Sequence, residues 1–398
     1  MPRRIGGLWP QILSFANLLL AARKARRGKR DRAAVQAFEF NLEGELLRLQ
    51  DELNSGAYRP GAFRSHWITH PKARLISAAP YRDRVVHHAL MNVLEPILDR
   101  RFHPHSFACR KGKGTHAAAD HLQQQMRRFG YAVQCDIRKF FPSIDHEILK
   151  LDFRRVVKDQ RALALMGLIV DSSNEQEQVQ EWFAGDDLLT PALRRRGLPI
   201  GNLTSQWFAN WYLNGLDYFA TGTLGVGGYV RYCDDFILLD DSREKLRDAG
   251  NGAIAFLAAR RLRLHEDRMN VQPCRCALTF VGFRQWASHR LLRKTNVCGF
   301  RRRLRWMRRT YGAGEMDWPE VKLRLNGWLG HAKQADTKHL LRRLSQEWVF
   351  GRGVAQGIPC VGSESRLAPV RFAQTSRTGL TANRNLTFPT GVIPALPA

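Results

Sequence analysis

The sequence predicts an α+β protein in which helical stretches alternate with short β-rich runs. Apolar residues recur at helical spacing from Phe38 to Leu53 and from Phe208 to Leu216. Residues 131–136 form a β-rich run, and residues 227–239 place apolar segments on both sides of a short acidic turn, the pattern of a β-hairpin. Since hairpin strands are antiparallel, we expect antiparallel pairing in the sheet.

The other elements are predicted in chain order. Ile5 to Ala22 is an amphipathic helix with a basic end, and Gly56 ends the helix that begins at Phe38. Residues 58–77 are extended and basic, and Pro142 stops regular pairing after the 131–136 strand. The remaining predictions are helices at 83–102, 146–170 and 243–264, a turn followed by a helix within 197–218, and a strand–turn–strand at 278–286.

The charge of the chain indicates a polyanionic partner. Its 398 residues include 63 Lys and Arg against 36 Asp and Glu, a formal net charge of +27. Solubility needs a far smaller net charge, so a nucleic-acid partner is favoured. A membrane is disfavoured because no stretch approaches about eighteen uninterrupted apolar residues.

Neither cysteines nor histidines form a metal-binding pattern. The seven cysteines lack a paired framework, so we expect reduced thiols and a cytoplasmic protein. Zinc is a minor alternative, because Cys274 and Cys276 have no neighbours at the right spacing. We expect four histidine side chains on the surface or facing RNA: His87, His88, His103 and His105.

Asp234 and Asp235 occupy the predicted hairpin turn. Adjacent acids bounded by β-forming residues are costly to bury unless a cation neutralises them. Mg²⁺ is usually held by one or two carboxylates together with substrate phosphates, which makes this turn a candidate metal site of a nucleotide polymerase. Taken alone, such a pair is more often a solvated loop.

A polymerase needs a further acid near this pair, because two-metal phosphoryl transfer uses ions about 4 Å apart. Asp136, at the end of the 131–136 strand, is the candidate, and Phe141 follows it where an aromatic ring can exclude a 2′-hydroxyl. Asp145 is a rival acid, but its position after Pro142-Ser143-Ile144 favours a helix cap.

Three further segments carry weaker signals. Residues 301–309 form a basic helix with a seam of Leu304, Trp306 and Met307; a solvated face is the alternative to the RNA or duplex contact that we favour. Residues 171–187 lose apolar periodicity, which predicts a surface insertion. Residues 352–398 are rich in Pro, Gly, Ser, Thr and Asn, which predicts a disordered tail.

In chain order, the strand ending at Asp136, the turn at 197–206 and the Tyr-Cys-Asp-Asp hairpin resemble a reverse transcriptase, over about residues 12–345. Within that class the chain is most similar to the enzymes of diversity-generating retroelements. Most reverse transcriptases have Gln-Gly after the proline of the middle motif, whereas this chain has Ile200-Gly201 and then Ser205-Gln206, as is typical of that retroelement family. Further matching segments are 72–77, 83–90, 108–117, 140–145 and 327–332.

The resemblance implies a right hand of fingers, palm and thumb, with an antiparallel palm sheet backed by helices and a helical thumb. The implied parts are a basic helical extension at 1–57, fingers at 58–130, a palm at 131–290 that includes fingers elements and an insertion at about 171–196, a thumb at 291–350 and a disordered tail at 351–398.

The resemblance also assigns residues to roles. Catalysis and the binding of two Mg²⁺ ions, for which Mn²⁺ is a substitute, go to Asp136, Asp234 and Asp235, with the Ile137 carbonyl as a further metal ligand. Nucleotide binding goes to Lys72, Arg74, Phe141, Ile200, Gly201 and Gln206. The primer grip is Val281, Gly282 and Phe283, and nucleic-acid contacts go to Arg301, Arg302, Arg305 and Arg308.

Two departures from the usual reverse transcriptase pattern have chemical consequences. Ile200 replaces the usual glutamine, and the loss of an amide contact to the nucleotide is expected to loosen base selection. Many polymerases protonate pyrophosphate with a lysine, but residues 264–269 contain none. The pKa of an arginine such as Arg268 is too high for that role, so water and His265 are the candidates left.

The implied activity is RNA-directed DNA synthesis, a nucleotidyl transfer that copies a template-repeat RNA into cDNA. In diversity-generating retroelements this copying is error-prone opposite template adenine, supports mutagenic retrohoming and involves a small basic multimeric accessory protein. The expected partners are therefore template RNA, the RNA/cDNA duplex, dNTPs and such a protein. The alternatives are a group II intron-like or retron-like enzyme of ordinary fidelity and an inactive RNA-binding scaffold.

Overall fold

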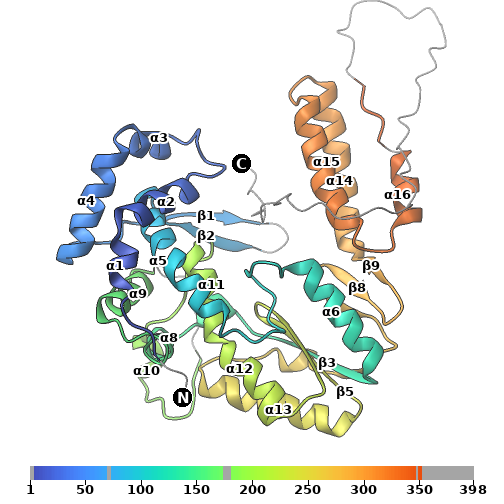
Figure 1. The fold of residues 1–398 in the computed structure, drawn as a ribbon. Helices are drawn as coiled ribbons and strands as arrows, with labels where there is room; N and C mark the ends of the chain where they lie inside the picture. Colours follow the sequence, from blue (N-terminus) through green and yellow to red (C-terminus); the bar gives the residue numbers. More distant parts are fainter. Residues whose placement is uncertain (1–3, 70–72, 174–180, 347, 352–398) are drawn as a thin grey trace, which may run out of the picture. The chain divides into compact units, whose positions relative to one another are not determined.

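A computed structural model describes residues 4–69, 73–173, 181–346 and 348–351 (Figure 1). The chain forms two compact units. The first contains the described residues up to Asn296 together with Ala332–Thr337, and the second contains Val297–His331 and the described residues from Lys338 onwards. The predicted role of Lys72 and the predicted tail at 352–398 lie outside the described residues.

Helices α1 to α4 form the N-terminal part of the first unit: Trp9–Leu13, Phe15–Ala25, Ala33–Phe40 and Leu42–Ser55. The single helix predicted from Ile5 to Ala22 is divided, because the Ser14 side chain accepts a hydrogen bond from the Asn17 N–H and starts α2 there. The predicted helix from Phe38 is likewise divided before Leu42, and it ends as expected at Gly56, whose φ is +77°. Both α1 and α2 pack on α5 (Tyr81–Asp99).

A four-stranded antiparallel sheet lies at the centre of the first unit, in the order β4 (Gly228–Tyr232), β5 (Asp235–Asp240), β3 (Tyr131–Asp136) and β6 (Val271–Pro273). Its two faces belong to different apolar clusters. Ala132 and Ile237 pack in the cluster that contains α6 (Thr115–Arg128), whereas Val133 and Leu238 pack in the cluster that contains α13 (Arg243–Ala259) (Figure 1). Because both faces are covered, the interior of the central strand β5, Phe236 to Leu239, is entirely apolar and buried. The predicted α+β class, with an antiparallel sheet backed by helices, is confirmed.

Smaller elements complete the first unit. β1 (Arg64–Ile68) and β2 (Arg74–Ala78) form a hairpin, and β7 (Leu278–Phe280), β8 (Phe283–Gln285) and β9 (Arg290–Leu292) form a three-stranded sheet. The other helices are α7 (Phe140–Ser143), α8 (His146–Arg154), α9 (Gln160–Asp171), α10 (Thr190–Leu193), α11 (Leu203–Tyr212) and α12 (Asn214–Tyr218), with a π-helical turn at Phe219–Thr223 and a 3-10 turn at Glu266–Arg268.

The second unit is built of helices. It contains most of α14 (Lys294–Gly312), most of α15 (Trp318–Ala332) and α16 (Lys338–Ser345). In α14 the predicted seam is correct for Leu304 and Met307, which are buried with Phe300, but it is wrong for Trp306, which is 37% exposed. Trp306 instead lies under the guanidinium of Arg324.

Several other predictions need correction. His87 and His103 are buried rather than on the surface, and burial lowers the pKa of His87 to about 3. The helix predicted at 243–264 ends at Ala259, and Arg261 then takes a left-handed conformation. The six described cysteines are free thiols. Within the described ranges, none of the helices combines the length and apolar character that a membrane crossing needs.

Candidate active site

The three predicted catalytic acids lie at the same end of two paired strands. Asp136 is the last residue of β3 and is the direct partner of Asp235, the first residue of β5. Tyr232 on β4 pairs with Asp235, so that Cys233 and Asp234 form a two-residue turn. The N–H of Ile137 donates to the Asp234 carbonyl at 3.3 Å, which ties this turn to the end of β3. The backbone ladder therefore brings all three carboxyl-bearing residues together.

The three acids repel one another when they are ionised. The pKa of Asp235 is raised to about 8, mainly by burial and also by the nearby Asp136 and Asp234, against a hydrogen bond from Gln134 that lowers it. Burial also raises the pKa of Asp234, with Asp136 adding to the effect and Arg74 opposing it. Buried like charges of this kind are stabilised by a cation.

The donor chemistry of the site fits a hard divalent cation. Carboxylate oxygens are the protein ligands that Mg²⁺ prefers, and substrate phosphates and water usually supply the remaining positions. Across the described part of the chain, no group of three His, Cys, Asp or Glu side chains is already gathered into a complete metal site.

Gln134 is a site residue that the sequence analysis missed. Its Nε2 donates to Asp235 Oδ1 at 3.0 Å and to Oδ2 at 3.3 Å, and also to the carbonyl of Thr279 at 2.9 Å. The signal was present, because Gln134 and Asp136 are two residues apart on one strand and so point to the same face. Arg293 was also missed; its charge lowers the pKa of Asp235.

Of the predicted nucleotide-binding residues, Arg74 lies within reach of the acids, and Ile200 and Gly201 are joined to its strand. Arg74 is exposed at the start of β2, and its charge reaches Asp234. Ile76 on the same strand forms a parallel bridge with Ile200, whose carbonyl accepts from the Ser77 N–H at 2.9 Å. A Cβ on Gly201, whose φ is +118°, would lie 3.1 Å from the Ile76 side chain. Only glycine fits this close approach without strain.

Two further predicted nucleotide-binding residues, Phe141 and Gln206, lie on the helices α7 and α11. Phe141, the residue predicted to exclude a 2′-hydroxyl, is half-buried on α7. Its carbonyl accepts from the Leu198 N–H at 2.9 Å, which joins α7 to the turn at 197–206. Gln206 is exposed on α11, whereas Ser205 and Trp207 beside it are buried. Its Oε1 lies 3.6 Å from the Cys109 thiol.

The predicted primer grip is the turn between β7 and β8. Val281 and Gly282 form it with positive φ values of 42° and 90°, and both are partly exposed. Phe283 is completely buried, so its side chain belongs to the core beneath the turn rather than to an exposed grip.

Asp145 has the structural role that was predicted for it. Its Oδ1 accepts from the Ile148 N–H at 3.0 Å and caps α8, and its Oδ2 pairs with Arg261 at 2.5 Å. Both oxygens of the Asp145 carboxylate are therefore engaged in structural contacts. His265 lies beside Asp136, because its backbone N–H donates to the Asp136 carbonyl at 2.9 Å.

The predicted nucleic-acid arginines lie on α14 in the second unit. Arg302, Arg305 and Arg308 are exposed and Arg301 is partly exposed, whereas Leu304 and Met307 of the same helix are buried. The charged face and the apolar face of this helix are thus separate, as in an amphipathic helix.

The chain is similar to known proteins over much of its length. Residues 68–284 match the family "Reverse transcriptase (RNA-dependent DNA polymerase)". Protein YkfC of Escherichia coli (strain K12) is 24% identical over 334 residues, covering 72% of this chain and 82% of that protein. The group II intron-encoded protein LtrA of Lactococcus lactis subsp. cremoris is 24% identical over 181 residues, covering 44% of this chain and 28% of LtrA.

Among solved structures, the apo telomerase of Candida tropicalis truncated from its C-terminal domain matches with a TM-score of 0.41 and 12% identity, over 60% of this chain and 57% of that chain. The family match at 68–284 spans more than half of the 398 residues. The chain therefore belongs to the reverse transcriptase family and is an RNA-directed DNA polymerase.

Proposed function

We propose that Asp136, Asp234 and Asp235 are the catalytic centre and that they hold two Mg²⁺ ions, for which Mn²⁺ is a substitute, with the Ile137 carbonyl as a further ligand. The observation that carries the proposal is the pairing of Asp136 with Asp235 beside the Asp234 turn. Bound metal would stabilise charge on the attacking and leaving oxygens. The protein's own part is to fix the carboxylates through the strand ladder and to hold the triphosphate with Arg74.

Asp234→Asn tests this centre. We expect primer extension on an RNA template to be lost while the fold is kept, because the substitution removes the charge and preserves the shape. Asp248→Asn is the matched control, since Asp248 is exposed on α13, away from the paired acids. Full activity of the Asp234 variant would reject the assignment, whereas absence of synthesis by the natural chain would favour the inactive RNA-binding scaffold.

We further propose that the enzyme copies a template repeat with frequent errors opposite adenine, as in diversity-generating retroelements. The support is Ile200, whose carbonyl is used by Ser77 and whose aliphatic side chain has no amide to offer the nascent base pair. Weaker polar recognition of the nucleotide lowers discrimination between correct and incorrect bases.

Sequencing of cDNA from an RNA of mixed composition tests the proposal. We expect errors concentrated at template adenine for the natural chain and fewer errors for Ile200→Gln. Gly201 and Gln206 stay unchanged in both proteins, so the comparison isolates one side chain.

A second candidate is a group II intron-like or retron-like enzyme of ordinary fidelity. The similarity to LtrA, a group II intron-encoded protein, favours it. Accurate cDNA from the natural chain, with no change in Ile200→Gln, would select this candidate.

The proposed partners are template RNA, the RNA/cDNA duplex, dNTPs and a small basic multimeric accessory protein. We propose that the helices of the second unit act as the thumb and that the exposed arginines of α14 contact the duplex backbone. Such phosphate contacts make binding strongly salt-dependent. Removing two of them, in Arg305→Gln/Arg308→Gln, should flatten the dependence of the Kd on salt.

A further inference from the structure

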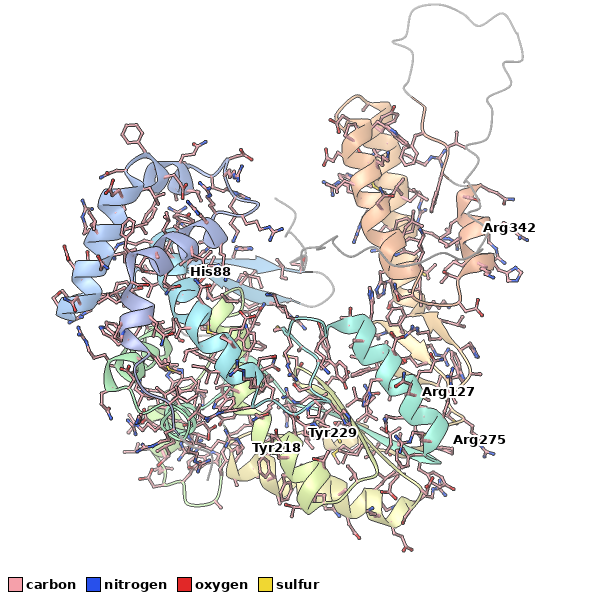
Figure 2. All side chains as sticks on the ribbon, viewed as in Figure 1. His88, Arg127, Tyr218, Tyr229, Arg275 and Arg342 are labelled. Carbon is pink, nitrogen blue, oxygen red and sulfur yellow. The ribbon has the colours of Figure 1, made fainter. Side chains whose placement is uncertain are left out.

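Arg231 on β4 is completely buried behind the catalytic hairpin, and so is its partner Asp217 on α12. Nε and Nη2 of Arg231 donate to Oδ1 and Oδ2 of Asp217, both at 2.6 Å. Tyr229, labelled in Figure 2, adds a hydroxyl donor to Asp217 Oδ1, also at 2.6 Å. Asp217 is thus fully engaged on one side of the guanidinium.

The other side of the guanidinium faces the catalytic turn. Nη1 of Arg231 donates to the carbonyl of Cys233 at 3.0 Å and to Oδ1 of Asn210 at 3.0 Å. Asn210 belongs to α11, the helix that also carries Gln206. One side chain therefore joins α12, α11 and the residue that immediately precedes Asp234.

Stability alone does not account for this arrangement. Replacing a buried ion pair with apolar residues of similar volume is often neutral or stabilising, because the charges pay a large desolvation cost. The Cys233 backbone has a φ of +60°, a left-handed conformation that is unfavourable for a non-glycine residue. A strained turn keeps its conformation only when its surroundings hold it, and the carbonyl that Arg231 contacts belongs to the strained residue.

We infer that Arg231 is a positioning residue that holds the Cys233–Asp234 turn in its catalytic conformation and couples it to α11. This inference rests on the proposed catalytic role of Asp234. Arg231 touches neither substrate nor metal; it acts through the peptide that orients the Asp234 carboxylate. The coupling through Asn210 fixes the position of this acid relative to the helix that carries Gln206.

Arg231→Lys tests the inference, since an ammonium keeps the charge beside Asp217 but lacks the fork that reaches Cys233 and Asn210 at the same time. We expect kcat for primer extension, normalised to active enzyme, to fall at least about tenfold. The Mg²⁺ concentration for half-maximal activity should rise, while the Kd for RNA and the KM for dNTP stay unchanged. Unchanged kcat and unchanged Mg²⁺ dependence would overturn the inference.

Arg194→Lys is the matched control, because Arg194 and Asp186 form another buried pair, with both side chains 4% exposed, and Arg194 makes no contact with the turn. It should lose comparable stability and keep kcat and Mg²⁺ dependence. If Arg231→Lys does not fold, Asn210→Ala keeps the pair with Asp217 and removes one acceptor; a raised Mg²⁺ requirement supports the inference, and an unchanged one rejects it. Activity in Asp234→Asn would instead reject the proposed centre itself.

Discussion

Two glutamines of the first unit have opposite hydrogen-bonding environments. We predict that leucine in place of the first lowers kcat, whereas leucine in place of the second raises the free energy of unfolding. Gln134 donates to both oxygens of Asp235 and to the Thr279 carbonyl. Gln285 on β8 is completely buried, and neither polar atom of its side chain has a hydrogen-bond partner among the described residues. Size and polarity are the same in the two cases, so any difference comes from the partners.

The magnitudes follow from these contacts. A hydrogen bond to a charged group is worth about 1.5–3 kcal/mol. If Gln134→Leu loses about 2 kcal/mol of orientation at Asp235, kcat falls by roughly thirtyfold, since about 1.4 kcal/mol is tenfold. Gln285→Leu removes a buried polar group with no partner to lose, so the free energy of unfolding should rise by about 1 kcal/mol with kcat unchanged.

Single-turnover primer extension and urea unfolding measure the two effects. The expected pattern is a slow Gln134→Leu enzyme and a stabilised Gln285→Leu enzyme. A Gln134→Leu enzyme of normal rate would refute the role given to Gln134. Equal destabilisation of both variants would show that packing, not hydrogen bonding, dominates at these positions.

Three further predictions concern charge. The folded pKa of Asp235 is about 8, whereas an unfolded aspartate has a pKa of about 3.9, so between these values the metal-free folded state holds a proton that the unfolded state has lost. The free energy of unfolding in EDTA should therefore fall as pH rises from about 4 to about 8. Asp235→Asn should flatten this slope. Asp145→Ala removes a helix cap and leaves Arg261 without its carboxylate, so urea unfolding should show a loss of about 2–3 kcal/mol, while kcat of the folded fraction stays normal; a loss of kcat would return Asp145 to the list of catalytic acids. Arg74→Lys should raise the KM for dNTP about tenfold in steady-state extension, because a point charge replaces the fork that binds the triphosphate, with unfolding unchanged at this exposed position; an unchanged KM would contradict the nucleotide role.

The hairpin and the helix cap were predictable because their signals are local. Apolar runs on both sides of a two-residue turn specify the β4–β5 pairing, and the aspartate at the start of α8 specifies its own cap. The same reasoning located Asp136, since strand 131–136 ends there in both the sequence pattern and the structure.

What the sequence did not reveal depends on contacts between distant segments. Arg231 looks like an ordinary polar residue between Val230 and Tyr232, and its burial follows only from the position of Asp217 on α12. His103 was expected on the surface, but its backbone N–H is bound by Asn214, 111 residues away. Periodicity describes which face a residue occupies, and it cannot say what covers that face.

The proposed catalytic acids and the residues proposed to face the nucleotide are held by two kinds of contact, which differ in how they tolerate substitution. Asp136 and Asp235 are aligned by backbone pairing, and Ile200 is attached to β2 through its carbonyl and the Ser77 N–H; neither attachment depends on the side chain. Any L-residue at position 200 can keep that bond, so the residue proposed to face the nascent base pair is free to change without loss of the fold. The Arg231 contact to Cys233 needs one particular side chain. Given these proposed roles, we expect substitutions of Ile200 to change base selection while Arg231 and the strand ladder keep the chemistry fixed.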